Sequence, residues 1–441
     1  MIKYIISIEK ITVILYNDNG DSMKVKIPKC NSTSEELLVY DKPKIVYIPL
    51  ISGNDTNITI LVNKGEYVYK GSMIAKRKGD FRIPIHSSVS GTVLDFEEKT
   101  CFNGTKVKCV AIENDFQEKY EENVVENKNI SKYSKEEFIN ILRDNGIVGM
   151  GGAGFPTYVK YDNPDIKTLI VNAVECEPYI TADYMIASKR CEEILETIDA
   201  ILEINRIEEA IIVIKESNET LKKLFDDYVG TYLKIKVKCV NDYYPAGWEK
   251  NIIKDVLKKE YINLPIECGV VVNNISTIYA IYEALKYNKP LVERIITFAG
   301  DTLNKSQNIM VKIGTPVSEI MKQLNVDKNK VMISGGPMMG NIVYHDLVIS
   351  ANQNCILFLN KEVVDCSMCI RCGKCTEVCP VKLSPVTIMK QLRSKKSNVN
   401  KLNKLQPLKC IECGLCSYIC PAKLNLREEV KKAKSSVKGV K

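Results

Sequence analysis

The sequence has no long uninterrupted run of apolar residues, and this absence limits how the protein can meet a membrane. Nowhere do about 18 uncharged apolar residues follow one another, the length that a transmembrane helix requires. The apolar amino terminus is interrupted by Lys3, Glu9 and Lys10, and no small-residue cleavage site follows it. A signal peptide is therefore not expected, and residues 4–15 are predicted to form a strand. These absences predict a cytoplasmic protein that does not span the membrane.

The sequence also lacks a strong excess of one charge, which argues against nucleic acid as a ligand. The 62 basic residues are dispersed among 54 acidic ones, for a net charge of +8, and no basic stripe with interleaved aromatic residues is present. The one concentrated basic stretch is the tail at residues 431–441. We interpret it as the solvated end of a helix. The alternative is contact with anionic lipid or an acidic partner, with peripheral association at the cytoplasmic membrane face.

Histidine and tryptophan are scarce. His86 and His345 are the only histidines, and neither lies in a motif; Trp248 is the single tryptophan.

The chain of 441 residues is too long to fold around one hydrophobic core of ordinary size, so about two to four domains are expected. A content of 45% apolar and 26% charged residues is typical of a folded protein.

Cysteine, by contrast, is abundant and clustered. Nine of the 17 cysteines fall between Cys366 and Cys420, where CIRCGKCTEVCP (369–380) and CIECGLCSYICP (410–421) each follow the pattern C-x2-C-x2-C-x3-C-P. This pattern binds a [4Fe-4S] cluster, and in two-cluster ferredoxins the fourth cysteine serves the other cluster. The spacing therefore predicts one cluster on Cys369, Cys372, Cys375 and Cys420, and a second on Cys410, Cys413, Cys416 and Cys379.

Structural zinc is the competing interpretation of these cysteines. Zinc ribbons separate two cysteine pairs by a long insert, whereas here four cysteines and a proline recur twice in the same order. Iron–sulfur ligation is therefore favoured, in a two-cluster ferredoxin domain at 360–430. Cys366 is interpreted as a spare thiol, because the second copy has Pro407 at the equivalent position.

The amino-terminal part predicts a strand segment at 1–40 and a small all-β domain at 41–116. The segments KGEYVYKGSMIA and SSVSGTV are typical of lipoyl-like barrel-sandwich domains. The modified lysine of such domains would lie in the turn near Ser87 to Ser90, and no lysine is there. We therefore expect a structural or docking role for this domain.

The middle of the chain, residues 130–290, predicts a Rossmann-like α/β domain. Ser134 and Glu137 form a predicted capping box at the start of a helix, and the glycine-rich loop GMGGAGFPTYVK (149–160) follows that helix instead of a strand. This order argues against an ordinary dinucleotide loop. Beyond the loop, strands are predicted at 168–175, 209–215, 234–240 and 268–274, alternating with helices near 183–204, 218–227, 249–258 and 276–287. Such alternation predicts a mostly parallel sheet, with ligands beyond the carboxyl ends of its strands.

Residues 291–350 predict a small α+β module like the ubiquitin-fold soluble-ligand-binding (SLBB) domains, to which we assign no chemistry. The whole chain is thus predicted to be a multidomain α/β protein.

The glycine loop suits a phosphate-bearing cofactor. Glycines at these positions allow close backbone approach and can direct N–H groups at a phosphate, while Lys160 adds a positive charge and Phe155 an aromatic face. Beside two clusters, a flavin would convert hydride pairs into single electrons.

Several motifs together resemble the RnfC family, the C subunits of Rnf electron-transport complexes. They are GIVGMGGAGFPTYVKY, VNAVECEPYIT, YPAGWEKNIIK, GVVVNNISTIYAI, GGPMMG and the two cysteine runs. The likeness covers about residues 40 to 430 and extends to soluble relatives, the electron-transfer protein associated with proline reductase (PrdC) and a cobalamin reductase (PduS). The middle domain is also similar to the flavin subunit of respiratory complex I.

This resemblance implies FMN and NADH in the middle domain. The residues implied around FMN are Gly149, Gly151, Gly152, Lys160, Asn172, Glu175, Cys176, Asn273, Asn274 and Thr277. Gly154, of the same glycine loop, is also predicted to bind the cofactor. Those implied to face NADH are Phe155, Glu177 and Glu249. The amides and the threonine would suit ribityl hydroxyls.

Two functions remain open from the sequence. In the first, the protein is an NADH:acceptor oxidoreductase subunit in which FMN passes single electrons to the clusters and on to a redox partner, namely an Rnf-complex subunit, a ferredoxin or a soluble reductase. In the second, it is an adaptor that relays electrons and does not bind NADH. Trp248 motivates the second, because the Rnf subunits usually carry glycine at that position.

Overall fold

The computed structural model describes residues 14–16, 24–26, 36–79, 81–121, 126–303, 305–361, 366–394 and 398–439. Most of the predicted strand at 4–15 and the last two residues of the basic tail lie outside this part of the chain. Strands β1 (Ile14–Tyr16) and β2 (Lys24–Lys26) pair antiparallel.

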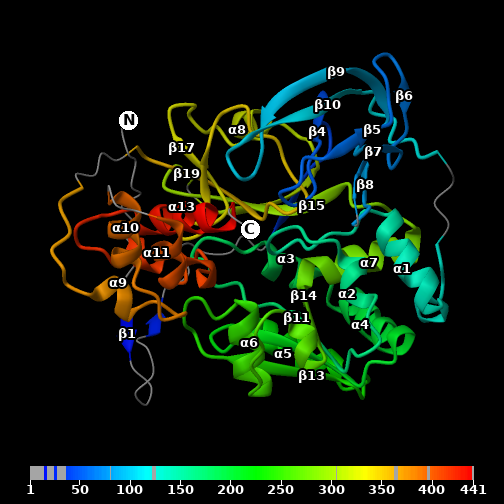
Figure 1. Ribbon diagram of the computed structural model, residues 1–441. Helices are drawn as coiled ribbons and strands as arrows, with labels where there is room; N and C mark the ends of the chain where they lie inside the picture. Colours follow the sequence, from blue (N-terminus) through cyan, green and yellow to red (C-terminus); the bar gives the residue numbers. More distant parts are fainter. Residues whose placement is uncertain are drawn as a thin grey trace.

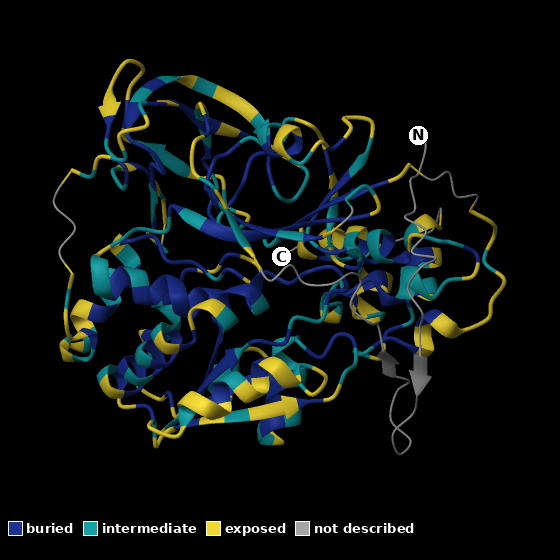
Figure 2. Cartoon of the chain, turned by 180° about the vertical axis from the view of Figure 1, so that it is seen from behind, coloured by how far each residue is buried: buried dark blue, intermediate teal, exposed yellow. Residues whose placement is uncertain are grey.

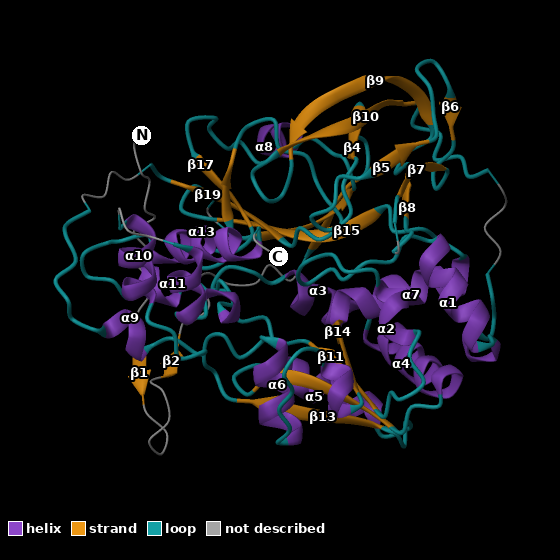
Figure 3. Ribbon diagram, viewed as in Figure 1, coloured by secondary structure: helices purple, strands orange, loops and turns teal. Residues whose placement is uncertain are grey.

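Three modules surround one central sheet (Figure 1). In that view the barrel sandwich lies above the long central sheet, a second sheet with its helices lies below, and the cysteine-rich helices lie to the left. Figure 3 shows the same division by secondary structure, with strands concentrated above and helices below and to the left. Buried segments run through the middle of the molecule where the modules meet (Figure 2).

The barrel sandwich consists of two small antiparallel sheets. One has the order β4-β10-β9-β6 and the other β5-β7-β8. Alternating apolar residues such as Val46, Ile48, Val110 and Ile112 are buried between them. The strands are β4 (Ile45–Pro49), β5 (Ile58–Ile60), β6 (Tyr67–Val68), β7 (Met73–Arg77), β8 (Pro84–His86), β9 (Gly91–Thr100) and β10 (Lys106–Asn114).

The middle domain has the predicted parallel sheet, with the order β13-β12-β11-β14. Its strands are β11 (Thr168–Asn172), β12 (Glu209–Lys215), β13 (Ile235–Val240) and β14 (Val270–Asn274). Its helices are α1 (Lys135–Asp144), α2 (Thr157–Tyr161), α3 (Ala182–Lys189), α4 (Cys191–Asn205), α5 (Glu219–Val229), α6 (Glu249–Leu257) and α7 (Ile275–Tyr287), with short 3-10 turns η1 (Ile130–Lys132) and η2 (Pro265–Cys268). The capping box of Ser134 and Glu137 is confirmed at the start of α1.

One predicted helix is wrong in its continuity. The segment predicted as a helix at 183–204 forms α3 and α4, because Arg190 between them leaves the helical region with φ −133°.

The strand order of the middle sheet indicates where a ligand can lie. The chain moves outward from β11 to β13 and then returns to the other side of β11 as β14, so a crevice opens at the carboxyl ends of β11 and β14.

The central sheet has six strands in the order β18-β17-β19-β15-β16-β3. Two of its strands lie outside the predicted range 291–350, because β3 comes from the amino-terminal segment and pairs parallel with β16, and β19 follows residue 350. The elements are β3 (Leu37–Tyr40), β15 (Glu293–Ala299), β16 (Gln307–Lys312), α8 (Val317–Gln323), β17 (Val331–Ser334), β18 (Asn341–Val343) and β19 (Cys355–Leu359).

The cysteine-rich module is helical. It contains α9 (Lys374–Glu377), α10 (Pro385–Arg393), α11 (Val399–Lys404), η3 (Pro407–Lys409), α12 (Leu415–Tyr418) and α13 (Leu426–Lys438). Residues 431–438 of the basic tail form the greater part of α13. Val430, Ala433 and Val437 of this helix are buried against the module. Within the described residues, no helix is long and apolar enough to cross a membrane.

A network of ion pairs joins the barrel sandwich, the middle domain and the central sheet. It comprises Lys70, Glu118, Glu283, Lys289, Glu293 and Lys312. Glu118 accepts from the ammonium groups of Lys70 at 2.6 Å and Lys312 at 2.9 Å. Burial tends to raise the pKa of Glu118, but the hydrogen bonds from Lys312 and Lys70 outweigh it and the pKa is lowered. Ionised Glu118 therefore compensates two buried ammonium groups, and Glu293 lies 4.0 Å from that of Lys70.

We expect Glu118→Gln to lower the free energy of unfolding of this junction by about 1–3 kcal/mol, because Lys70 and Lys312 lose their charged partner. The lowered pKa gives the sign of the pH dependence: the Glu118 contribution is complete above its ordinary pKa of 4.5 and is lost as the pH falls through the lowered value. Thermal unfolding at several pH values measures both. Asp95→Asn, which removes an exposed pair with Lys64, is the control and should leave the stability nearly unchanged, because solvent screens that pair. Equal effects of the two variants would contradict the prediction.

Candidate functional site

A cavity of about 560 Å³ lies in the crevice at the carboxyl ends of β11 and β14. All fourteen residues proposed from the sequence for FMN or NADH line it. The central sheet and the cysteine-rich module complete its wall. Lining residues that sequence reasoning missed include Phe102, Asp183, Gly247, Asn341, Asn352 and Ile411.

The glycine loop forms one wall and is anchored to α7. The N–H of Gly149 donates to the Phe155 carbonyl at 2.9 Å and closes the loop, and the N–H of Met150 donates to Thr277 Oγ1 at 3.0 Å. A Cβ at Gly151 would lie only 2.6 Å from Asn274 Nδ2, so the loop can approach the start of α7 only without a side chain there.

The central sheet also holds this loop. The buried guanidinium of Arg294 donates to the Met150 carbonyl at 3.4 Å and to the carbonyl of Ala351, and Asn352 Nδ2 donates to the Gly152 carbonyl at 3.2 Å. Burial lowers the pKa of Arg294 to about 10, so the guanidinium stays charged at neutral pH. No sequence motif pointed to Arg294 or Asn352, because both lie far along the chain from the loop.

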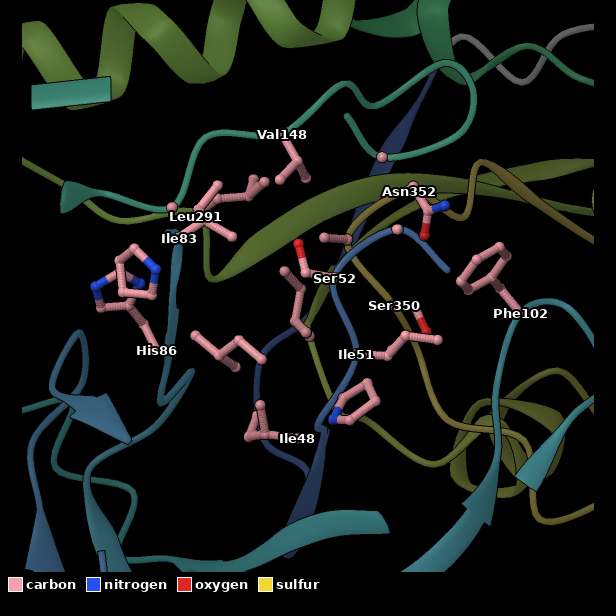
Figure 4. A pocket seen from close by; sticks show the side chains of 18 residues that line it. Ile48, Ile51, Ser52, Ile83, His86, Phe102, Val148, Leu291, Ser350 and Asn352 are labelled. Carbon is pink, nitrogen blue, oxygen red and sulfur yellow. The ribbon is translucent and has the colours of Figure 1, made fainter. Parts of the chain in front are cut away.

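The barrel sandwich supports the loop from a third side. At Gly53, which has a φ of +60°, a Cβ would lie 2.8 Å from the Ala153 carbonyl oxygen. Next to this contact, a cavity of about 60 Å³ is lined by Ser52, His86 and Val148, whose side chains Figure 4 shows around it. Burial lowers the pKa of His86 to about 4, so the imidazole is neutral at physiological pH. The barrel sandwich therefore acts as a packing support for the loop.

Lys160 brings a buried positive charge to the cavity. Its ammonium donates to the Val272 carbonyl at 2.7 Å and lies 3.5 Å from Asn273 Oδ1. Burial lowers the pKa of Lys160, and the charge of Glu249 opposes this shift. A buried ammonium beside neutral oxygen atoms favours an anionic ligand, and FMN carries a phosphate. This residue therefore fits the implied cofactor.

The asparagines of the site are already engaged with the protein. Asn172 accepts from the Val174 N–H at 2.9 Å and donates to the Gly247 carbonyl at 3.0 Å. Asn273 donates to the Tyr161 hydroxyl, and Asn274 donates to Asp183 Oδ2 at 2.6 Å while it caps α7. These side chains thus position the strand ends, and their oxygen atoms keep lone pairs for a ligand.

The three glutamates at the site have different partners. Glu175 Oε1 accepts from the Asp183 N–H at 2.9 Å, and Glu249, the first residue of α6, accepts from the Tyr261 hydroxyl at 2.7 Å. Glu177 is buried, and its two carboxylate oxygens accept the N–H groups of Met338 at 3.1 Å and Met339 at 2.8 Å. Glu177 is therefore tied to the central sheet as well as to the cavity.

Two aromatic side chains lie at the cavity. Phe155 is 41% exposed and packs edge-to-face on Phe81, with ring centroids 5.4 Å apart. Trp248 lines the cavity beside Glu249 and is the N-cap residue of α6. An exposed ring at the mouth of a polar cavity can stack on a planar ligand.

The cysteines predicted as cluster ligands line two further cavities, in the two sets that the spacing predicted. The inner set, Cys379, Cys410, Cys413 and Cys416, lines a cavity of about 20 Å³. The outer set, Cys369, Cys372, Cys375 and Cys420, lines one of about 200 Å³. The S–H of Cys366 donates to the Lys423 carbonyl, and Cys366 lines neither cavity.

The inner set reaches the large cavity. Cys413 lines both its own cavity and the large one, and its carbonyl accepts from the buried Tyr244 hydroxyl at 2.8 Å. Cys176 also lines the large cavity and packs against the apolar cluster that contains Cys413. The two implied kinds of cofactor would therefore be neighbours.

Three family models match the chain. The Nuo51 FMN-binding domain matches residues 142–283, the RnfC barrel sandwich hybrid domain matches residues 22–117, and a 4Fe-4S dicluster domain matches residues 361–422. An FMN-binding domain is therefore followed by an iron–sulfur domain, and the zinc interpretation of the cysteines is not supported.

Curated relatives match most of the chain. The C subunit of the proton-translocating ferredoxin:NAD(+) oxidoreductase complex of Clostridium ljungdahlii is 34% identical over 358 residues, which cover 78% of this chain and 77% of that protein. The C subunit of the Na(+)-translocating complex of Acetobacterium woodii is 32% identical over 370 residues, covering 81% and 83%. A crystal structure of an NAD+-reducing [NiFe]-hydrogenase is 14% identical with a TM-score of 0.49, and the match covers 70% of this chain and 64% of that chain.

We expect Lys160→Met to lower FMN affinity about ten- to hundredfold, because a charged hydrogen bond to phosphate is lost. The same change removes a buried charge, so the melting temperature of the FMN-free protein should not fall. Titration of the FMN-free protein with FMN measures the affinity, and Lys167→Met, at an exposed position of the same domain, is the control. An unchanged FMN affinity in Lys160→Met would remove Lys160 from the site.

Proposed function

The chain belongs to the RnfC family, as its motifs predicted, and we propose that it oxidises NADH through FMN and passes single electrons through two [4Fe-4S] clusters to a protein partner. Membership of the family and the FMN-binding and iron–sulfur domains make it an electron-transfer flavo-iron–sulfur subunit. The electron donor, the number of clusters, the partner and a cytoplasmic location at the membrane face are the proposed parts.

One observation carries the proposal. Cys413, a predicted cluster ligand, lies on the wall of the cavity that the predicted FMN and NADH residues line. A flavin in that cavity would therefore lie beside the inner cysteine set. The outer set is the next along: Cys375 of the outer set and Cys416 of the inner set pack in one apolar cluster. The order cavity, inner set, outer set is thus built into the fold.

The bound flavin would supply the conversion between hydride and single electrons. The residues of the chain bind and orient it. The backbone of the glycine loop and Lys160 would hold the anionic part, and Arg294 keeps the loop in place through the Met150 carbonyl. Glu249, whose carboxylate is held by Tyr261, and Phe155, with its exposed ring, would receive the nucleotide.

The alternative is a relay protein that does not bind NADH, and Trp248 is the observation that favours it. Its side chain lines the cavity directly before Glu249, where an indole could occupy the space of the nicotinamide. The two functions differ in one measurable step, the reduction of the flavin by NADH.

We expect anaerobic mixing with NADH to bleach the flavin absorbance and then that of the clusters. Phe155→Leu should raise the KM for NADH about two- to tenfold through lost stacking, with flavin content unchanged. Phe116→Leu, at another exposed ring, should change neither. If NADH does not bleach the flavin although dithionite reduces it, the relay function holds; recovery of bleaching in Trp248→Gly would then identify the indole as the block.

The loop of the outer cysteine set is exposed around Cys372, and we propose that electrons leave there to an acidic redox protein. Met368 and Ile370 are 89% and 65% exposed, and Cys372 is exposed between Arg371 and Lys374 of the same loop. Exposed apolar side chains with basic neighbours suit a transient partner of opposite charge. The relatives' partners in ion-translocating complexes, a ferredoxin or a soluble reductase are the candidates.

We expect Arg371→Glu with Lys374→Glu to slow electron transfer to a small acidic ferredoxin about tenfold at low salt, because steering by opposite charge is reversed. The difference should shrink at high salt. Stopped-flow reduction of the ferredoxin measures the rate, and Lys167→Glu with Lys223→Glu, at two exposed positions of the middle domain, is the control with the same change in net charge. Equal salt dependence in the variant and the control would contradict this exit surface.

A further inference from the structure

The turn between β17 and β18, residues 335–340 with the sequence GGPMMG, lines the large cavity, but the function proposed above assigns no role to its residues. Nevertheless, the middle domain and the cysteine-rich module both contact its backbone. We call it the docking turn. It is tightly closed, since the Gly340 N–H donates to the Gly336 carbonyl at 2.8 Å, and a Cβ at Gly340 would lie 2.4 Å from that oxygen.

The middle domain contacts the docking turn through Glu177. Its buried carboxylate accepts the N–H groups of Met338 and Met339, which is a charge-assisted arrangement. A Cβ at Gly336 would lie 2.3 Å from Glu177 Oε2, so the carboxylate reaches these N–H groups only because residue 336 is glycine.

The cysteine-rich module contacts the same turn through Arg427. Its guanidinium donates to the Met339 carbonyl at 2.6 Å and to the Gly340 carbonyl at 3.0 Å. The third donation goes to the Glu412 carbonyl at 3.0 Å, in the loop of the inner cysteine set. The N–H of Met339 thus donates to the carboxylate of Glu177, and its carbonyl accepts from the guanidinium of Arg427. The two opposite charges are linked through the backbone of one residue.

Packing holds this arrangement close. A Cβ at Gly414, which has a φ of +82°, would lie 2.2 Å from the Met338 carbonyl oxygen. The side chain of Met338 is buried with Tyr244, Cys413 and Leu415 in one cluster. The inner cysteine loop therefore lies directly on the docking turn, without room for a side chain between them.

We propose that Glu177 and Arg427 are positioning residues that fix, through the docking turn, the separation between the flavin cavity and the inner cysteine set. The inference deepens the proposed function and rests on its flavin and inner cluster, though not on NADH. The rate of electron transfer between two centres falls steeply with their separation. Two charged contacts to the same rigid turn hold the cysteine-rich module at a fixed distance from the flavin cavity, and the transfer rate therefore does not vary.

The test compares Arg427→Met with Arg393→Met in the full-length protein with FMN and clusters bound. Arg393 is the matched control, because its guanidinium pairs with Glu429 inside the cysteine-rich module. In Arg427→Met we expect amide hydrogen exchange at 336–340 and 411–414 to rise about tenfold or more, since charged hydrogen bonds are lost. Electron transfer from photoreduced flavin to the clusters should slow several-fold, and the magnetic coupling between the singly reduced flavin and the inner cluster should weaken.

Arg427→Lys, which can still donate one hydrogen bond, should give intermediate values. Should Arg427→Met lose its clusters, Gly340→Ala distorts the docking turn without touching the cysteine loops, and Gly230→Ala, with open space at its Cβ, is its control. The proposal is overturned if Arg427→Met and Arg393→Met show the same hydrogen exchange and the same magnetic coupling. If Arg427→Met has lost its clusters, the same comparison is made between Gly340→Ala and Gly230→Ala. No readout uses NADH, and exchange is also measured without FMN, so failure of NADH oxidation is distinguishable from failure of this inference.

Discussion

The backbone of the glycine loop is the constraint on which the site depends, since three modules must meet on it. The hydroxyl of Thr277 accepts a hydrogen bond from an N–H of the loop. Arg294 and Asn352 donate to carbonyls of the loop. Gly53 of the barrel sandwich packs on Ala153. Glycine-rich backbone has little conformational preference of its own. The shape of the loop is therefore imposed by the modules around it. This explains why an FMN-binding domain is joined to a barrel sandwich that lacks the lysine expected of a swinging arm.

The charged groups of the site are mostly compensated by backbone dipoles and not by opposite charges. Arg294 and Lys160 donate to carbonyls, and Glu177 accepts from N–H groups. Backbone groups in a rigid loop can satisfy a buried charge without a counter-ion. The loop must then keep a single conformation, because any shift would break these hydrogen bonds. The positive charge of Lys160 therefore stays available to an anionic ligand, while Glu177 and Arg427 are used between modules.

Local patterns account for what the sequence could predict. The parallel strands, the capping box at Ser134 and the two cysteine sets follow from periodicity and spacing over a few residues, and the strand ends then bring Asn172 and Asn274 to one crevice. Long-range pairing accounts for what it could not. Strand β3 joins the central sheet more than 250 residues from its partner β16, and Arg294 and the docking turn carry no motif for contacts to distant modules. Which partners Asn273 and Glu177 use depends on that same assembly.

The burial of the two cysteine sets gives the molecule a direction. The inner set is enclosed by the flavin cavity, the docking turn and Tyr244, whereas the loop of the outer set is exposed around Cys372. A centre enclosed by protein exchanges electrons only with its neighbours in the same chain, and an exposed one can also meet a diffusing partner. The contacts of Arg427 help to maintain this difference in exposure, because they join the inner cysteine loop to the docking turn and do not involve the outer loop. One arginine on α13 thus links the packing of two modules to the order in which electrons would pass.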